Sequence, residues 1–156
     1  MLVGYAAVFY RKGDPATEYE LWDGVVERVM PGAFDRALRE KDDVRGLFNH
    51  DRTLLLGRTS SGTMRLSVDQ VGLKYAIDVP DTQAGRDVII VAERGDLSGS
   101  SFSFLPDDSG GVLWREEEDG DIRELHSVKL YDVGPVTFPA YEGTTAGVRG
   151  HNAGGG

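Results

Sequence analysis

The chain of 156 residues contains no cysteine, which excludes disulfide bonds, a cysteine nucleophile and thiolate metal ligands. It also lacks any run of about 18 apolar residues, so no segment is expected to span a membrane. The apolar stretch 1–9 has no basic residues before it and is predicted to be a strand rather than a signal peptide. Basic residues are outnumbered by acidic ones, 17 to 26, and the net charge is −9. Nucleic acid and anionic membranes are therefore not expected as partners.

Sequence motifs for bound groups are missing as well. The chain has 21 glycines, but none of them stands in the GxxxxGK[ST] pattern of a phosphate-binding loop. The histidines do not have the spacing of an HExxH metal site. We therefore expect neither a cofactor nor a metal ion.

Length and composition indicate one globular domain. Hydrophobic residues make up 40% of the chain and charged residues 28%, which is ordinary for a globular protein of this size. The domain is expected to cover residues 1–145. The glycine-rich residues 146–156 are predicted to form a disordered tail.

The hydrophobic pattern predicts many short strands and two helices. The helices are expected at 31–40, where Ala33/Phe34 and Ala37/Leu38 share a face, and at 82–94, with Asp81 as the cap and Gly95 as the end. The expected strands are 2–9, 24–30, 44–48, 54–59, 64–68, 72–79, 101–104, 112–117, 122–133 and 136–138. This order predicts an α+β protein, namely a small, mainly antiparallel β-barrel with a few flanking helices.

The segment 95–104 is a candidate for the functional site. From Ser101 to Phe104 it alternates small polar and aromatic residues, as a half-buried strand does. Phe102 and Phe104 would then anchor the strand in the core, while Ser101 and Ser103 face a groove. A serine presented in this way can act as a nucleophile if a base lies near it. Without a base, the same pattern describes the polar face of an ordinary strand.

His50 is the candidate base. It follows an apolar strand and is flanked by Asn49 and Asp51. A neutral imidazole can take the proton of a serine hydroxyl. The alternative is a histidine bonded to a backbone group at the end of a strand.

A third group would have to orient His50. If 122–133 is one strand, His126, Val128, Leu130 and Asp132 share a face. Either a second imidazole, His126, or a carboxylate, Asp132, could then contact His50. Each could equally be a solvated group at the edge of the core. At about 3.3 Å per residue they lie roughly 20 Å apart, so only one of the two can be the partner.

Several short segments in a fixed order resemble one family. They lie within residues 3–149 and are Gly4–Phe9, Pro31–Phe34, Asn49–Asp51 with Leu56–Thr59, Pro80–Thr82 with Gly85–Asp87, Arg94–Asp96 with Ser101–Phe102, and Leu130–Tyr141. In this order they resemble the prohead protease of tailed double-stranded-DNA phages, which is similar in fold to the herpesvirus assembly protease, a β-barrel ringed by helices.

The resemblance implies a serine endopeptidase that works as a dimer inside the immature shell, in the host cytoplasm. Its expected substrates are the scaffold, the scaffold-like segment of the major capsid protein, and the protease itself. The alternative is an inactive capsid-assembly domain of the same fold, which would bind scaffold without cleaving it.

The resemblance also assigns candidate residues. The histidine of the family's Asn-His-Asp motif falls on His50, and the serine that precedes phenylalanine falls on Ser101. Relatives commonly have Met-Ser-Phe-Gly-Phe here, so Ser100 and Ser103 depart from the pattern and could compete for the role. The herpesvirus enzymes have a second histidine near the position of His126, whereas phage relatives often have an acid on this strand, which points to Asp132. The catalytic set is thus Ser101, His50 and either His126 or Asp132, with a slight preference for His126.

Overall fold

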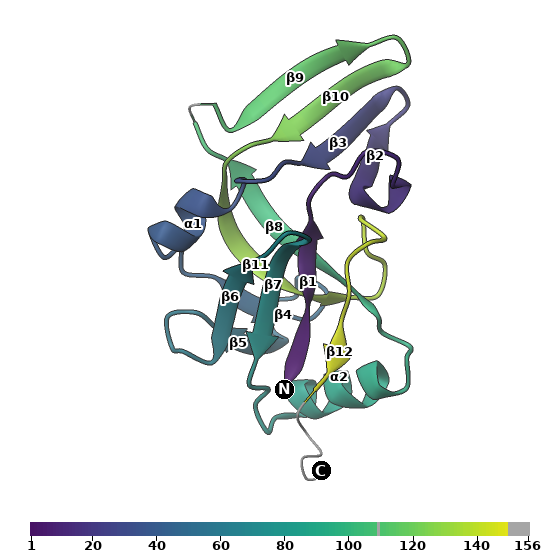
Figure 1. The fold of residues 1–156 in the computed structure, drawn as a ribbon. Helices are drawn as coiled ribbons and strands as arrows, with labels where there is room; N and C mark the ends of the chain where they lie inside the picture. The colour runs from purple at the N-terminus through teal and green to yellow at the C-terminus, as the bar shows by residue number, and fades with distance from the viewer. Residues whose placement is uncertain (109, 150–156) are drawn as a thin grey trace.

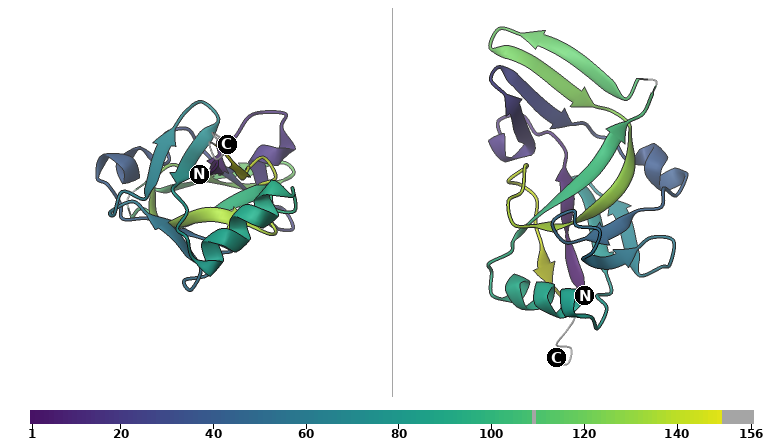
Figure 2. Two further views of the ribbon diagram at one scale, coloured as in Figure 1. Left: turned by 90° about the horizontal axis from the view of Figure 1, so that it is seen from below. Right: turned by 180° about the vertical axis from the view of Figure 1, so that it is seen from behind.

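The computed structural model describes residues 1–108 and 110–149. In this part of the chain, twelve strands form three four-stranded sheets, accompanied by helices α1 (Asp35–Arg39) and α2 (Gln83–Glu93) and the short 3-10 helix η1 (Pro15–Thr17). Figure 1 shows one sheet at the top of the molecule and the other strands below it, with α2 across the lower end. The view from behind in Figure 2 shows the same separation.

Each sheet combines strands that are distant in the sequence. The first sheet has the order β12 (Gly147–Val148), β1 (Leu2–Val8), β7 (Gly72–Ile77) and β6 (Met64–Val68); the second, at the top of Figure 1, has β2 (Glu18–Trp22), β3 (Val25–Val29), β10 (Gly120–Leu125) and β9 (Val112–Glu117); the third has β5 (Leu55–Arg58), β4 (Arg45–Leu47), β11 (Val128–Val136) and β8 (Gly99–Pro106). Neighbouring strands are antiparallel except for two parallel pairs, β3 with β10 and β4 with β11.

The core lies where β1, β7, β8 and β11 face one another. Phe102 of β8 is buried there, with its ring edge-on to Phe34 at 5.5 Å and stacked on Phe104 at 4.8 Å. Ser101 and Ser103 point away from this core and are partly exposed. The alternation predicted for this strand is therefore confirmed, because burying the two aromatic rings turns the intervening serines outward.

The prediction of an α+β fold is confirmed, but the described strands do not form one closed barrel. They divide among three sheets, and the second and third are separate because the chain changes sheets at a point where the sequence predicts a continuous strand, 122–133. The amides of His126 and Ser127 both donate to the carbonyl of Gly111 (2.8 and 3.3 Å), which ends β10 before β11 begins. The single-strand prediction is therefore wrong, since β10 belongs to the second sheet and β11 to the third.

The other differences from the expected elements are smaller. Helix α1 covers only the second half of the predicted 31–40, and Thr82 rather than Asp81 caps α2, accepting from the amide of Gly85 at 3.1 Å. Gly95 follows α2 with φ +85°, a conformation that suits glycine at the end of a helix. Strand β2 was not predicted.

The expected tail is described only in part. Gly147 and Val148 form β12 beside β1, although the sequence predicts a disordered tail from residue 146. Residues 150–156, the rest of that tail, lie outside the described residues.

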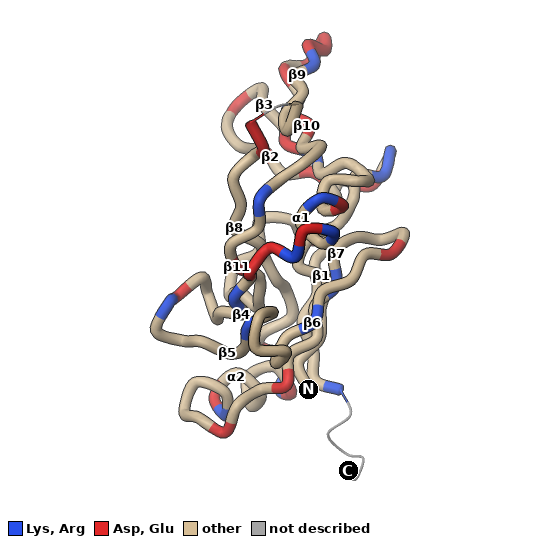
Figure 3. Tube along the Cα trace, turned by 90° about the vertical axis from the view of Figure 1, so that its left-hand side faces the viewer, with Lys and Arg blue, Asp and Glu red and all other residues tan. Residues whose placement is uncertain are grey.

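Charged groups are unevenly distributed over the surface. Figure 3 shows acidic residues gathered around the turn between β9 and β10, where charged side chains are solvated. None of the helices in the described part of the chain is long and apolar enough to cross a membrane.

A network around Arg36 joins α1 to the third sheet. The Arg36 guanidinium donates to both carboxylate oxygens of Asp42 (3.1 and 2.9 Å), to Asp107 (2.9 Å) and to the carbonyl of Val128 (2.9 Å). Asp42 in turn accepts from the amide of Leu130 at 3.0 Å. Because Val128 and Leu130 belong to β11, the network fixes α1 against this strand.

We expect Arg36→Met to lower the free energy of unfolding by about 2–3 kcal/mol at neutral pH, because two partly buried carboxylates lose their cation. Burial alone would raise the pKa of Asp42, but the bonds from Arg36 and Leu130 lower it overall, and the bond from Ser127 together with Arg36 lowers that of Asp107. A lowered carboxylate pKa stabilises the fold above the unfolded value of about 3.9, and this stabilisation is lost as the pH falls further.

The measurement is urea denaturation of wild type and variant at several pH values. The difference in the free energy of unfolding between wild type and Arg36→Met should be largest near neutral pH and should shrink below about pH 4. Arg39→Met is the matched control on the same helix, since the Arg39 side chain is 69% exposed and its one ion pair among the described residues is with Glu40, at 3.8 Å. An equal loss in both variants would contradict the prediction.

Candidate active site

The loop after β4 places His50. Asn49 and His50 both have positive φ, +55° and +57°. Asparagine and histidine adopt this left-handed conformation more often than most residues do, but it costs energy for any residue other than glycine. The loop must therefore be held from both sides.

Asn49 holds the loop on one side. Its side-chain amide donates to Thr137 Oγ1 (3.1 Å) and its carbonyl oxygen accepts from the amide of Thr137 (2.8 Å). Its backbone amide donates to the carbonyl of Pro135 at 2.9 Å. These three bonds attach the residue before His50 to the end of β11.

Asp51 holds the loop on the other side. Its Oδ1 accepts from the amide (2.8 Å) and the hydroxyl (2.6 Å) of Thr53, and the hydroxyl bond is the main reason that the pKa of Asp51 is lowered. The Asn-His-Asp sequence therefore consists of two residues that shape the loop and one imidazole between them. His50 is left 36% exposed.

The side chain that contacts the His50 ring most closely is Asp132, at 2.5 Å between Nδ1 and Oδ1. Asp132 lies on β11 opposite Arg45 of β4, in the parallel pair that brings the end of β4 alongside β11. A bulge between Leu130 and Asp132 shifts the register of β11 against β8, so that Asp132 faces Ser103. Asp132 is 15% exposed, so its carboxylate is partly shielded from water beside the imidazole.

Ser103 also contacts the His50 ring, on the same side as Asp132. Its Oγ lies 3.0 Å from His50 Nδ1, the nitrogen that Asp132 also contacts. Ser103 is therefore placed on the carboxylate side of the imidazole.

Ser101 lies on the same face of β8, two residues or roughly 7 Å from Ser103. Its cross-strand partner is Gly134, whose φ is +155°. A Cβ on Gly134 would come within 2.0 Å of the Leu47 carbonyl oxygen, so only glycine allows β4 to approach β11 this closely. No side chain therefore stands opposite Ser101, which is partly exposed and forms no side-chain hydrogen bond within residues 1–108 and 110–149.

Ser100 points the other way, into the core. It is completely buried, and its hydroxyl contacts Tyr75 Oη and donates to the carbonyl of Thr145, both at 2.7 Å. Burial raises the pKa of Tyr75, so the phenol remains a neutral partner in this contact. Ser100 is thus a structural residue that attaches β8 to β7 and to the segment before β12.

His126 lies between β10 and β11 and contacts Glu124 rather than His50. Its Nε2 is 3.0 Å from Glu124 Oε1, while Arg115 donates to Glu124 Oε2 at 2.9 Å. Burial raises the pKa of Glu124, but the bonds from His126 and Arg115 outweigh burial and lower it overall. The expectation that His126 and Asp132 share a face of one strand is wrong, because the chain changes sheets between them.

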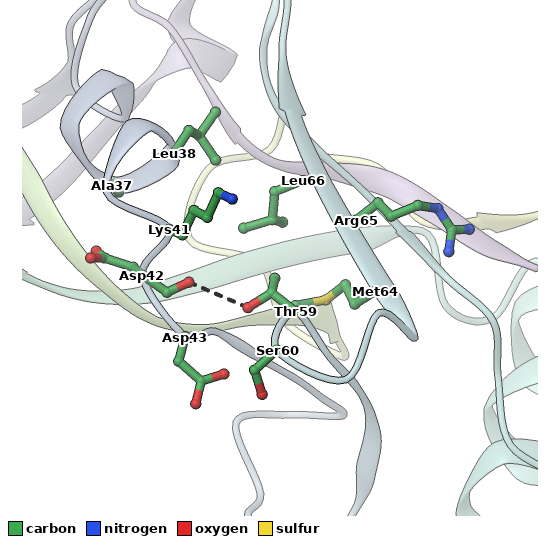
Figure 4. A pocket seen from close by; sticks show the side chains of 10 residues that line it. All are labelled: Ala37, Leu38, Lys41, Asp42, Asp43, Thr59, Ser60, Met64, Arg65 and Leu66. Atoms are coloured by element: carbon green, nitrogen blue, oxygen red, sulfur yellow. Dashed lines mark hydrogen bonds between the residues drawn. The ribbon is translucent and has the colours of Figure 1, made fainter.

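A separate pocket of about 520 Å³ lies between α1, the loop after β5 and strand β6. Figure 4 shows Leu38, Lys41 and Leu66 around it, with the Thr59 hydroxyl donating to the carbonyl of Asp42 at 3.3 Å. Neither His50 nor the outward-facing serines of β8 line this pocket. Within the described residues, no three histidine or acidic side chains come together as metal ligands would.

The contacts at His50 were predicted only in part. The sequence identified His50, Ser101 and Asp132 as candidates, but it did not identify Thr137 as the partner of Asn49 or place Ser103 against the imidazole. The presence of Ser103 in the serine-rich stretch was the one signal available.

The structure brings together a serine face from β8, an imidazole from the loop after β4 and a carboxylate from β11. These are the groups that serine hydrolases use. The family model described as caudovirus prohead serine protease matches residues 1–153. The chain belongs to this family. No curated protein and no solved structure matches the chain. The prohead protease described here is therefore a serine protease of capsid maturation, as the resemblance in its sequence implied.

Proposed function

We propose that this prohead protease is an endopeptidase with Ser101 as nucleophile, His50 as general base and Asp132 as the group that orients the imidazole. The observation that carries the proposal is the 2.5 Å contact between His50 Nδ1 and Asp132 Oδ1 beside the outward-facing serines of β8. We do not keep the slight preference for His126, because its imidazole contacts Glu124 rather than His50.

The proposed chemistry depends on which nitrogen of the His50 ring contacts Asp132. With its proton on Nδ1 and directed at Asp132, His50 has its lone pair on Nε2. Nε2 takes the proton of Ser101 as Oγ attacks the scissile carbonyl, and returns it to the leaving amine as the peptide bond breaks. Water then hydrolyses the acyl-enzyme by the same route. Asp132 stabilises the imidazolium that forms in each step.

Ser101 is preferred over Ser103 because the two hydroxyls stand at different places relative to the ring. Ser103 contacts Nδ1, which the carboxylate needs, so we assign it to holding the ring together with Asp132. Ser101 is partly exposed and forms no side-chain hydrogen bond within the described residues, so its hydroxyl is free to attack a substrate carbonyl. The approach of Ser101 to Nε2 is expected to tighten when substrate binds, as is common in hydrolases.

The proposed substrates are the scaffold, the scaffold-like segment of the major capsid protein, and the protease itself. We propose that the protease cleaves them within the prohead and acts as a dimer. The test is co-expression with the cognate capsid and scaffold proteins, followed by mass measurement of all products. We expect shortened capsid and scaffold chains with wild type and full-length chains with Ser101→Ala. Full-length chains with the wild-type protease, bound to scaffold, would instead support an inactive assembly domain.

A further inference from the structure

Phe138 is an aromatic residue that the fold leaves almost entirely in solvent. Its side chain is 91% exposed, whereas the next most exposed large hydrophobic residue of the described chain, Trp22, reaches 60%. A single exposed apolar residue is ordinary on a protein surface. The position of Phe138 is not ordinary, because both of its neighbours are fixed to the elements that carry the proposed catalytic residues.

The residue before it is fixed to the His50 loop. Thr137 exchanges two hydrogen bonds with Asn49, at 2.8 and 3.1 Å. The backbone on the N-terminal side of Phe138 is therefore held in place by Asn49, the residue that precedes His50.

The residue after it is fixed to the strand that carries Ser101. Pro139 packs on Gly99 so closely that a Cβ on Gly99 would lie 2.6 Å from Pro139 Cγ. Phe138 is thus presented by a short bridge between the loop of the base and the strand of the nucleophile. An aromatic side chain on a backbone held at both ends can contact a ligand without ordering a loop, which lowers the entropic cost of binding.

The register of β8 and β11 limits the distance between Phe138 and Ser101. Gly134 pairs with Ser101 and Val136 with Gly99, and Phe138 follows two residues further along the chain. The offset from Gly134 is four residues, or at most about 13 Å of extended chain. The chain bends at residues 137–138, and Pro139 returns to Gly99, so the true distance is shorter than this limit. An extended substrate advances by the same amount per residue, so a side chain no more than about four residues from the scissile bond reaches Phe138.

We propose that Phe138 is a specificity-determining residue of the protease, which binds an apolar side chain of the extended polypeptide within about four residues of the scissile bond. This inference rests on the proposed function, since it takes the scissile carbonyl to lie at Ser101. The adjacent residues Thr137 and Pro139 carry no charge, so an apolar side chain is the partner that gains most from contact with the ring.

The effect on kinetics follows from the distance to the chemistry. A contact this far from the reacting atoms is the same in the ground state and the transition state, so its loss weakens binding and leaves kcat unchanged. Phe138→Ala should therefore raise KM roughly tenfold, as truncation of an aromatic anchor does, with kcat within about twofold of wild type. The melting temperature should not change, because the side chain is 91% exposed.

The experiment measures binding as well as turnover. The probe is a fluorescent peptide spanning the capsid cleavage site that the co-expression products define, with a series in which each position is replaced in turn by glycine. Dissociation constants are measured by anisotropy for Ser101→Ala and for Ser101→Ala/Phe138→Ala, and KM and kcat for wild type and Phe138→Ala. Trp114→Ala is the control, since Trp114 is an exposed aromatic (53%) on β9 of the second sheet.

The expected result is that Phe138→Ala weakens peptide binding about tenfold, whereas Trp114→Ala leaves the dissociation constant unchanged. One glycine peptide should bind Ser101→Ala about tenfold more weakly than the parent peptide does and show no further loss with Ser101→Ala/Phe138→Ala, which would identify the contacted position. Unchanged binding, a loss that is the same for every glycine peptide, or conversion of a dimer to a monomer by Phe138→Ala in sedimentation would each overturn the proposal. Cleavage of the peptide by Ser101→Ala would overturn the nucleophile assignment separately.

Discussion

Ser101→Ala is expected to abolish peptide cleavage, with a loss of at least about 10³-fold in kcat, because the general base then has no hydroxyl to deprotonate. The fold should be unaffected. Ser101 faces outward on β8, is partly exposed and has no side-chain hydrogen bond within the described residues, so the melting temperature should match that of wild type. The measurement is the cleavage rate of a peptide from the mapped capsid site, together with thermal denaturation of both proteins.

Two neighbouring serines serve as controls. Ser103→Ala should retain cleavage, with a loss of about tenfold or less, because Asp132 still holds the imidazole. Ser100→Ala should mainly lower stability, by about 1–3 kcal/mol, since it leaves the buried Tyr75 hydroxyl without its partner. If Ser103→Ala loses all activity while Ser101→Ala keeps it, then Ser103 is the nucleophile and the orientation proposed for the His50 ring must be reversed.

Asp132→Asn is expected to lower kcat by about 10³–10⁴-fold with little change in melting temperature. The amide nearly preserves the shape of the carboxylate, but it can present its NH₂ group to Nδ1. His50 would then carry its proton on Nε2 and could not accept one from Ser101. The measurement is single-turnover cleavage at saturating peptide, which separates the chemical step from binding.

His126→Ala is the matched comparison, because both residues were candidates for the same role. It removes a bond to the buried Glu124 and should lower the free energy of unfolding by about 1 kcal/mol, while the cleavage rate stays within about threefold of wild type. A normal rate for Asp132→Asn with a collapsed rate for His126→Ala would move the third catalytic role to His126. Normal rates for both would mean that Ser101 and His50 work as a pair.

Local pattern was sufficient for several elements of the fold. Strands β6 and β9 have the predicted bounds, and β1, β3, β7 and α2 differ from prediction by a few residues at most. In each of them the hydrophobic period is continuous and a turn or a capping residue marks the ends. The break between β10 and β11 has no such marker, because apolar residues alternate on both sides of it. It results from hydrogen bonds to Gly111, which no local pattern encodes.

The candidate groups of this prohead protease, and the direction in which two of them face, follow from local sequence alone. Burial of Phe102 and Phe104 turns Ser101 and Ser103 outward, and the Asn-His-Asp sequence contains the residues that shape the loop around His50. Which of these groups contact one another depends instead on how distant segments of the chain pack together. The contact between His50 and Asp132 depends on the parallel pairing of β4 with β11, on a bulge in β11, and on a glycine at 134 that lets the strands approach. These are interactions between segments about 80 residues apart. Periodicity along the chain reports only which way a side chain faces, whereas pairing between distant strands depends on how the whole core packs.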